Sequence, residues 1–320
     1  MEVCNLGTTI IDNLVVCFLA SPDRLEELRY IQQSASFLNF RMFRAEGPFH
    51  RHFFTLYTND YQQLGNLYFD RYASQGNELY VWLKVENSCL YDRSYMDIID
   101  EIMHQFDFEF HGITSLDLAR DFDYNVASRI RALMRREDLA VVINGREVKK
   151  RDETLTTVFR ICGMSLARDG VKGLTIKQAK AAKNKHRGIT LDCYDKAEEI
   201  RNASGKKYIS DFYGGRKRLY RLELRMNCEQ IKRAAENTGF PYSRDLLEWQ
   251  TALDAIFIYA LQSVLRFRKS RTVQQWEDIF KMRCQGIYQH TLPLHTLLNQ
   301  MIDFEPEGSK KTCHFKNVPF

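Results

Sequence analysis

The chain has 320 residues and a mass of 37.7 kDa, and 44% of its residues are apolar, which suffices for one large domain or two small ones. Charged residues make up 27% and aromatic residues 12%, so the composition excludes an intrinsically disordered chain. Lys and Arg outnumber Asp and Glu by 46 to 41, and a net charge of +5 does not by itself indicate a polyanionic partner.

The first part of the chain is predicted to form mainly strands. A helix is predicted over residues 21–38, after the start signal Ser21-Pro22-Asp23, and another over 94–106. A third helix is expected over 125–136. Segments rich in Val, Phe, Tyr, Leu and Trp with partial alternation predict strands over residues 13–20, 49–58, 78–86, 112–123, 173–176, 188–194 and 219–226.

The pattern changes after Asn227. Helices are predicted over 228–237, 245–268 and 272–286, the first of them ended by Thr238-Gly239. Strands that precede helices, with few β-α-β alternations, disfavour a doubly wound parallel sheet. The sequence therefore predicts an α+β fold, with an antiparallel sheet-based body over 1–226 and a helical C-terminal region over 227–320 packed on it.

Membrane and disulfide-stabilised classes are disfavoured. The longest apolar stretch, residues 252–265, contains Asp254 and Gln262 and is interpreted as a buried helix. The eight cysteines are scattered without a Cys-x-x-Cys pair, which disfavours a zinc site or a disulfide framework. We therefore predict a cytoplasmic protein without a membrane partner.

Positive charge is concentrated in residues 146–218. This segment has 19 Lys and Arg against 9 Asp and Glu, a net charge of +10, which leaves −5 for the remainder of the chain. A local excess of this size favours a phosphate backbone as partner. The alternative is an ordinary solvated face or loop.

Three predicted strands alternate strictly between apolar and polar residues. Since alternate side chains share a face, the strands would gather their polar residues on one side of a common sheet. Those polar residues are Asp117, Asp121, Asp123, Asp192, Tyr194, Arg221, Glu223 and Arg225.

Such a polar face has side chains suited to metal binding and to nucleophilic catalysis. Converging carboxylates suit a hard divalent cation such as Mg²⁺ or Mn²⁺. A tyrosine beside the metal is a possible nucleophile toward phosphate, but its pKa near ~10 requires a base or a cation to activate it. Glu199 and Lys196 follow Tyr194 closely enough to reach the phenol if the chain turns. The alternative is that these are the ordinary polar faces of antiparallel strands.

Three short motifs carry a resemblance to a known family. They are residues 116–121 (Leu-Asp-Leu-Ala-Arg-Asp), 194–199 (Tyr-Asp-Lys-Ala-Glu-Glu) and 221–224 (Arg-Leu-Glu-Leu). In their order and spacing they resemble the replication initiation factor (Rep-trans-type) family of rolling-circle plasmids and related mobile elements. The resemblance extends over roughly residues 10 to 285 and includes a C-terminal helical region with Trp276.

The resemblance implies metal-dependent, site-specific nicking and joining of DNA through a covalent 5′-phosphotyrosine, which leaves a 3′-OH primer. Tyr194 matches the nicking tyrosine, and Asp117 and Glu223 match metal-binding carboxylates, with Asp121 close by. Glu199 matches the acid after the tyrosine, as ligand or base. Lys196 is expected to stabilise charge on the phosphate.

Partners are also implied: origin DNA (duplex, or a hairpin with a single-stranded nick site), a second copy in a homodimer, and a host helicase. Residues 177–187, between the strands predicted over 173–176 and 188–194, are rich in lysine. We expect this basic stretch to contact the DNA backbone, either as a hairpin arm or as a helix with lysines along one side. Arg120 departs from the family's hydrophobic residue, which is expected to alter the metal face. The predicted DNA contacts are Lys177, Lys180, Lys183, Lys185, Arg187 and Arg221.

Two other functions remain open: a non-catalytic initiator or repressor that only binds DNA, and a tyrosine recombinase that needs no metal. Cys193, beside Tyr194 on the apolar side of its strand, is interpreted as packing. Trp82 and Trp249 are interpreted as core residues rather than platforms for stacked bases.

Overall fold

The structure is a computed structural model that describes residues 4–72, 79–136, 138–144, 146–148, 165–168, 171–177 and 188–269. Most of its strands belong to one large sheet. In the order of the chain the strands are β1 (Ile10–Leu19), β2 (Ser34–Ser36), β3 (Phe40–Ala45), β4 (His50–Thr58), β5 (Gln63–Arg71), β6 (Tyr80–Val85), β7 (Glu109–Phe122), β8 (Leu139–Ile143), β9 (Arg146–Val148), β10 (Ser165–Arg168), β11 (Val171–Lys177), β12 (Thr190–Asp195), β13 (Tyr220–Asn227) and β14 (Leu265–Lys269).

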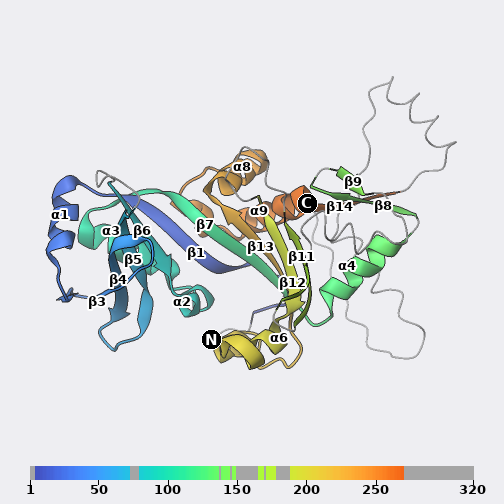
Figure 1. Cartoon of the computed structure of the whole chain (residues 1–320), viewed down its shortest axis with the longest axis horizontal. Coiled ribbons are helices and arrows are strands. Elements are labelled where there is room, and N and C mark those ends of the chain that lie inside the picture. The colour runs from blue at the N-terminus through green and yellow to red at the C-terminus, as the bar shows by residue number, and fades with distance from the viewer. Residues whose placement is uncertain are drawn as a thin grey trace, which may run out of the picture.

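The large sheet has 11 strands in the order β10-β11-β12-β13-β7-β1-β6-β5-β4-β3-β2, and β14-β8-β9 form a second, 3-stranded sheet. Neighbouring strands in both sheets are antiparallel. In Figure 1 the long strands β1, β7 and β13 run side by side through the centre of the molecule. The α+β prediction with an antiparallel sheet is confirmed.

The helices lie between and beside these strands. None of the described helices is both long enough and apolar enough to cross a membrane. They are α1 (Pro22–Tyr30), α2 (Asn87–Tyr91), α3 (Tyr95–Phe106), α4 (Val126–Arg135), α6 (Lys196–Glu199), the π-helix η1 (Ile200–Ser204), α7 (Lys207–Phe212), α8 (Cys228–Thr238), the 3₁₀ helix η2 (Arg244–Leu247) and α9 (Gln250–Val264).

Local sequence explains where α8 begins and ends. Asn227 accepts a hydrogen bond from the Gln230 backbone N–H, and the Gln230 side chain accepts one from the Asn227 N–H, which forms a capping box. At the other end Gly239 adopts φ +79°, a left-handed conformation that glycine reaches without steric cost. The helix predicted over 228–237 is thereby confirmed.

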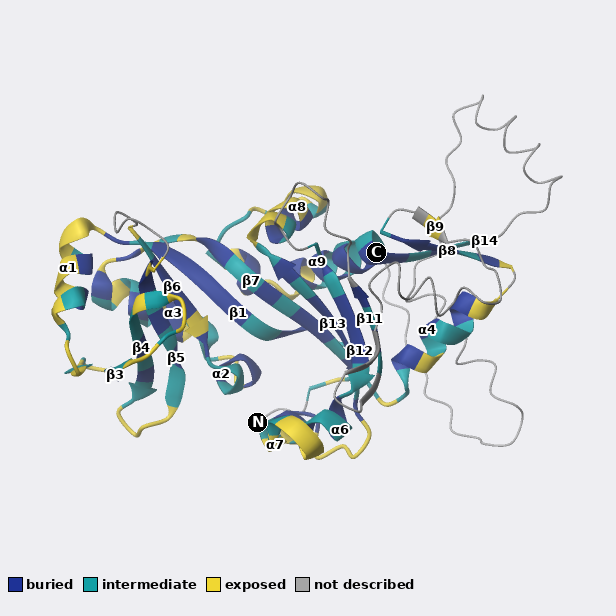
Figure 2. Cartoon of the chain, in the orientation of Figure 1, coloured by how far each residue is buried: buried dark blue, intermediate teal, exposed yellow. Residues whose placement is uncertain are grey.

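One hydrophobic core joins the sheet to its covering helices. Buried residues of β7 and β13 share it with buried residues of α3, α8 and α9. Figure 2 shows the central strands buried over most of their length, with exposed residues gathered on α1, α7 and α8. Helices α8 and α9 cover one face of β7 and β13. The polar positions of these strands lie on the other face, which α2 and α6 cover at the end that holds Arg221.

The structure differs from the predicted elements in several places. Strands β2, β3, β5, β8, β9 and β10 are not among the predicted strands, and β2 lies within the helix predicted over 21–38, which ends at Tyr30. Strands β2, β9 and β10 have only three or four residues, too few to carry a periodic signal. The helix predicted over 245–268 is instead η2 and α9, and Leu265 begins strand β14 because it pairs with β8. The helix predicted over 272–286 lies outside the described residues.

Candidate active site on the open face of the sheet

Three neighbouring strands bring the predicted site residues to one face. In the register of β12 and β13, Asp192 lies opposite Glu223 and Tyr194 lies opposite Arg221. In the register of β13 and β7, Arg225 lies opposite Asp117. Directly paired residues of antiparallel strands project to the same side of the sheet, so the polar face predicted from alternation is confirmed.

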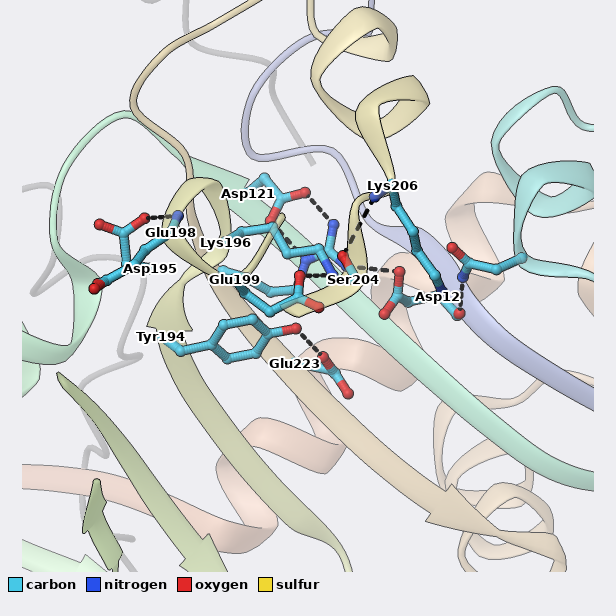
Figure 3. A network of polar contacts seen from close by, with 12 residues as sticks. Asp12, Asp121, Tyr194, Asp195, Lys196, Glu198, Glu199, Ser204, Lys206 and Glu223 are labelled. Carbon is cyan, nitrogen blue, oxygen red and sulfur yellow. Dashed lines mark hydrogen bonds and ion pairs between the residues drawn. The ribbon is translucent and has the colours of Figure 1, made fainter. Parts of the chain in front are cut away.

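The phenol of Tyr194 is held against a carboxylate. Its hydroxyl donates a hydrogen bond to Glu223 Oε2 at 2.7 Å (Figure 3). Burial of the hydroxyl, and then the Glu223 charge, raise the pKa of Tyr194 well above its ordinary value. Cys193 is buried in the core on the other face, as predicted. The phenol is therefore protonated at neutral pH, with its proton directed at a possible base.

Three carboxylates surround one guanidinium. Arg225 Nε lies 2.7 Å from Glu223 Oε1 and 3.9 Å from Asp117 Oδ2, and Arg225 Nη2 lies 3.2 Å from Asp192 Oδ2. Thr175 on β11 donates a hydrogen bond to Asp192 Oδ1 at 2.5 Å. We call Asp117, Asp192 and Glu223 the carboxylate cluster. It gathers three acids around a single positive charge.

The shortage of positive charge affects Asp117. Burial, and then the Glu223 carboxylate, raise the pKa of Asp117 to about 8, although Arg225 opposes the shift. A carboxyl with this pKa is mostly protonated at neutral pH. A further cation in the carboxylate cluster would favour its ionised form.

The predicted metal ligands are not arranged as a finished metal site. Within the described ranges, no three His, Cys, Asp or Glu side chains are close enough together to hold a metal ion. In the carboxylate cluster the central position belongs to Arg225, whose side chain is 39% exposed. Oxygen donors from adjacent strands are nevertheless the ligand type that Mg²⁺ and Mn²⁺ prefer.

Two predicted site residues belong to a different environment, and their predicted roles are wrong. Asp121 and Arg221 are each 0% exposed and form a two-fold ion pair, with Arg221 Nε 2.8 Å from Asp121 Oδ1 and Arg221 Nη2 2.6 Å from Oδ2. Both Asp121 oxygens are thus taken by a guanidinium, which removes it as a metal ligand. Arg221 cannot reach a DNA phosphate, because it is enclosed by protein.

Asp12 and Tyr91 complete the buried network of Arg221. Arg221 Nη1 lies 2.6 Å from Asp12 Oδ1, and the Tyr91 hydroxyl donates to the same oxygen at 2.6 Å. Burial alone would raise the pKa of Asp12, but Arg221 and Lys196 hold it well below its ordinary value. Asp12 and Asp121 raise the pKa of Arg221 against the opposing effect of burial. The ion pair between Asp12 and Arg221 is therefore fully charged at neutral pH.

Lys196 and Glu199 lie behind the tyrosine ring. Lys196 Nζ is 5.7 Å from the centroid of the Tyr194 ring and 3.0 Å from Glu199 Oε2. Asp195 caps this short helix by accepting a hydrogen bond from the Glu198 N–H at 2.8 Å. Figure 3 shows Lys196 and Glu199 beside the ring, whereas the hydroxyl points to Glu223. Glu223 is thus the acid in contact with the phenol.

The predicted DNA-gripping stretch lies mostly outside the described residues. Lys177 ends strand β11, and its pairing with Thr190 puts the two strands side by side as expected. The side chain of Lys177 and the residues Lys180, Lys183, Lys185 and Arg187 lie outside the part of the chain that the structure describes. These contacts stay a prediction.

Strict alternation places Asp192 and Arg225 on the polar face, but it assigns a role to neither residue. Their signal was present, because both belong to the strict alternation that identified Tyr194 and Glu223. Asp12 gave no such signal, since it lies at an irregularity where β1 shifts register against β7.

Comparisons with known proteins add little. No family model matches the chain, and no curated protein sequence matches it. Among solved structures, one similar chain is a rolling circle replication initiator protein from Geobacillus stearothermophilus. The two chains are 12% identical with a TM-score of 0.41, and the match covers 83% of this chain and 88% of that chain. At this similarity the match carries no argument, so the function proposed below rests on the site.

Proposed function

We propose that this protein starts rolling-circle replication as a metal-dependent DNA nicking and joining enzyme. The observation that carries the proposal is the Tyr194 hydroxyl, which donates to Glu223 Oε2 at 2.7 Å beside the carboxylate cluster. A tyrosine with an adjacent base and metal-type ligands is an arrangement suited to metal-assisted nucleophilic attack on a phosphodiester. The net charge of +10 in residues 146–218 supports a polyanionic substrate.

The reaction is a transfer of one phosphodiester bond. Tyr194 Oη attacks the phosphorus atom at the nick site while Glu223 Oε2 receives the phenol proton. The bond between phosphorus and the 3′ oxygen breaks, and that oxygen takes a proton from water to become the 3′-OH primer. The 5′ phosphate remains on Tyr194, and the reverse steps join the strand again.

Asp117 and Glu223, with Asp192 beside them, are the residues that would hold Mg²⁺ or Mn²⁺. Their fit is supported by the cationic head of Arg225, which the same three carboxylates already surround at 2.7 to 3.9 Å. When bound, the metal supplies a positive charge that polarises the scissile phosphate and favours the phenolate. We expect the half-exposed Arg225 to give up its central position to the metal.

Lys196 and Glu199 act as positioning residues in this proposal. Their ion pair packs behind the Tyr194 ring and directs its hydroxyl toward Glu223. Burial, and then the nearby Arg221, lower the pKa of Lys196. A lysine held in this way orients the ring more readily than it reaches a phosphate.

The test is nicking of a supercoiled plasmid that carries the candidate origin, with Mg²⁺ or Mn²⁺ present. The wild-type protein should nick it and remain covalently attached to the 5′ end, and Tyr194→Phe should lose both activities. Tyr220→Phe, on the neighbouring strand β13, is the matched control and should retain them. Nicking by Tyr194→Phe at the wild-type rate would overturn the proposal.

The same assay separates the alternatives. Salt-sensitive origin binding without an adduct under any metal condition would indicate a non-catalytic initiator or repressor. An adduct that forms in EDTA would indicate a metal-independent tyrosine recombinase. The homodimer and the host helicase remain predictions, which sedimentation and co-purification would test.

A further inference from the structure

The open face of the sheet continues from the tyrosine site into a row of aromatic side chains. Across strands β1, β6, β5 and β4, residues Cys17, Trp82, Tyr68 and Phe53 are successive Cα partners. The rings of Phe53 and Tyr68 stack at 5.7 Å with 10° between their planes, and those of Tyr68 and Trp82 at 6.2 Å with 14°. We call Phe53, Tyr68 and Trp82 the aromatic strip.

The strip lies on the same face as the carboxylate cluster. Asn13 of β1 pairs with Asp117, and Val15, two residues further, pairs with Lys84 of β6. Trp82 is two residues from Lys84, so all of these side chains project to one side of the sheet. Val15, Cys17 and Trp82 accordingly form a small hydrophobic cluster of their own, separate from the main core.

The surroundings of the strip are positive. The Arg71 guanidinium lies 4.5 Å from the centroid of the Trp82 ring, and the exposed Lys84 lies in the next row of paired residues. That next row, which runs from β1 to β3, is Val15, Lys84, Asn66, Thr55 and Phe43. Neither row contains an Asp or a Glu.

We propose that the half-buried rings of Phe53 and Tyr68, backed by the buried Trp82 ring and the neighbouring His50 ring, bind unpaired bases of single-stranded DNA, away from the phosphate that Tyr194 attacks. Flat rings with adjacent cations match the bases and the backbone of a single strand. Duplex DNA keeps its base faces inside its own stack, so it cannot use the strip. The inference rests on the proposed function and deepens it, because an enzyme that nicks one strand must also hold that strand.

The distance between Tyr194 and the aromatic strip sets the number of nucleotides between the nick and the bound bases. Strands β12 and β6, which carry Tyr194 and Trp82, are four strand spacings apart in the sheet. The two residues are also offset along the strands. On β7, Asp121 lies in the row of Tyr194 and Gly112 lies in the row of Trp82, nine residues away. At about 4.8 Å per strand and about 3.4 Å per residue, the two points are roughly 35 Å apart. The strip would therefore hold bases several nucleotides from the nick.

Binding without chemistry tests the strip. All proteins carry Tyr194→Phe, and fluorescence anisotropy measures their affinity for an oligothymidylate of about 30 nucleotides and for a duplex of the same length. The double variant Phe53→Leu/Tyr68→Leu keeps apolar bulk but removes two flat faces. Its affinity for the single strand should fall by about tenfold or more, while its affinity for the duplex stays within about twofold.

Two further variants secure the interpretation. Tyr30→Leu changes a 75% exposed tyrosine on α1 and should bind the single strand like its parent. Arg71→Gln changes an exposed side chain, so it tests the strip even if the double variant does not fold, and should weaken single-strand binding by about threefold.

Unchanged single-strand affinity in both the double variant and Arg71→Gln would overturn the inference. The inference would also be overturned if the parent protein were a dimer and the double variant a monomer. The aromatic strip would then bind a second copy of the chain and not DNA. Nicking by the wild-type protein is measured separately. A protein that does not nick but loses single-strand binding in the double variant would refute the proposed function and leave the strip intact.

Discussion

Two arginines that lie four residues apart on β13 have different roles because their burial differs. Arg221 is 0% exposed and is fixed between Asp12 and Asp121. Arg225 is 39% exposed and touches the carboxylate cluster from the solvent side. Removing a fully buried charge leaves its partners uncompensated, whereas an exposed guanidinium can move into water. The alternation that groups these residues therefore does not tell which acids are free to bind a ligand.

Asp117→Asn should stabilise the metal-free protein, by an amount that increases with pH. The pKa of Asp117 is about 8 in the folded state against an ordinary value of 3.8. A carboxyl whose pKa is raised by folding stabilises the folded state fully below about pH 4 and loses this effect as the pH rises to about 8. Asparagine cannot ionise, so it avoids that loss.

Thermal unfolding in EDTA between about pH 4 and pH 9 measures this effect. The difference in Tm between Asp117→Asn and wild type should widen up to about pH 8 and then level off. Asp123→Asn, at an exposed position near the end of the same sequence motif, should show no such trend. A difference that is constant with pH would show that Asp117 ionises normally.

At the scale of elements, β7 serves a different purpose on each face. Asp117 faces the carboxylate cluster, whereas Arg120 points to α9 on the other side. Arg120 Nη2 lies 2.8 Å from Asp254 Oδ1, its Nε donates to Thr9 Oγ1 at 2.8 Å, and its guanidinium stacks 4.6 Å from the Phe257 ring centroid. The expectation that Arg120 alters the metal face is wrong, because one step along a strand reverses the side.

The contact between Arg120 and Asp254 predicts that substitutions of the two residues lower the free energy of unfolding by different amounts. Asp254→Ala leaves the largely buried Arg120 guanidinium without its carboxylate and should cost about 1–2 kcal/mol of unfolding free energy. Arg120→Met should cost less, because methionine still packs on Phe257 and the 39% exposed Asp254 can be hydrated. Urea unfolding of both variants checks the order, and a larger loss in Arg120→Met would contradict this account of how α9 is held.

At the scale of the whole molecule, one sheet separates stability from chemistry. Its core face is covered by α3, α8 and α9. Its other face carries the tyrosine site and the aromatic strip, and α2 and α6 cover this face only around Arg221. Trp82 is buried as predicted, but in the small second cluster on the open face rather than in the main core. Trp249, also predicted to be core, is 41% exposed at the start of α9 because it precedes the helix's buried stripe.

The basic segment predicts how duplex binding responds to salt. Replacing Lys180, Lys183 and Lys185 together with Gln should reduce the slope of log K against log salt concentration by about 0.9 for each phosphate that is no longer neutralised. Arg233→Gln, on α8 and outside the segment, should leave the slope unchanged. Anisotropy titrations at several salt concentrations measure both, and an unaltered slope in the triple variant would refute the predicted grip.

Most of the site was readable from the sequence, since strict alternation assigns a face without knowledge of the fold. It placed Tyr194, Asp117 and Glu223 together once their strands became neighbours. The hydrogen bond from Tyr194 to Glu223, and not to Glu199, could not be predicted from the sequence, because it depends on the register between β12 and β13. Short strands such as β2 and β14 were missed because their pairing partners, not their own composition, make them strands.

The sequence by itself determined the α+β class, the strands β1, β7, β12 and β13 and the capped helix α8, because periodicity and capping act over a few residues. Only the tertiary structure decided that Asp121 and Arg221 neutralise each other while Asp117, Asp192 and Glu223 share one exposed guanidinium. It also decided that aromatic residues from distant segments form a row. The physical reason is that burial and charge pairing depend on which strands are neighbours, and strand order is a property of the whole sheet.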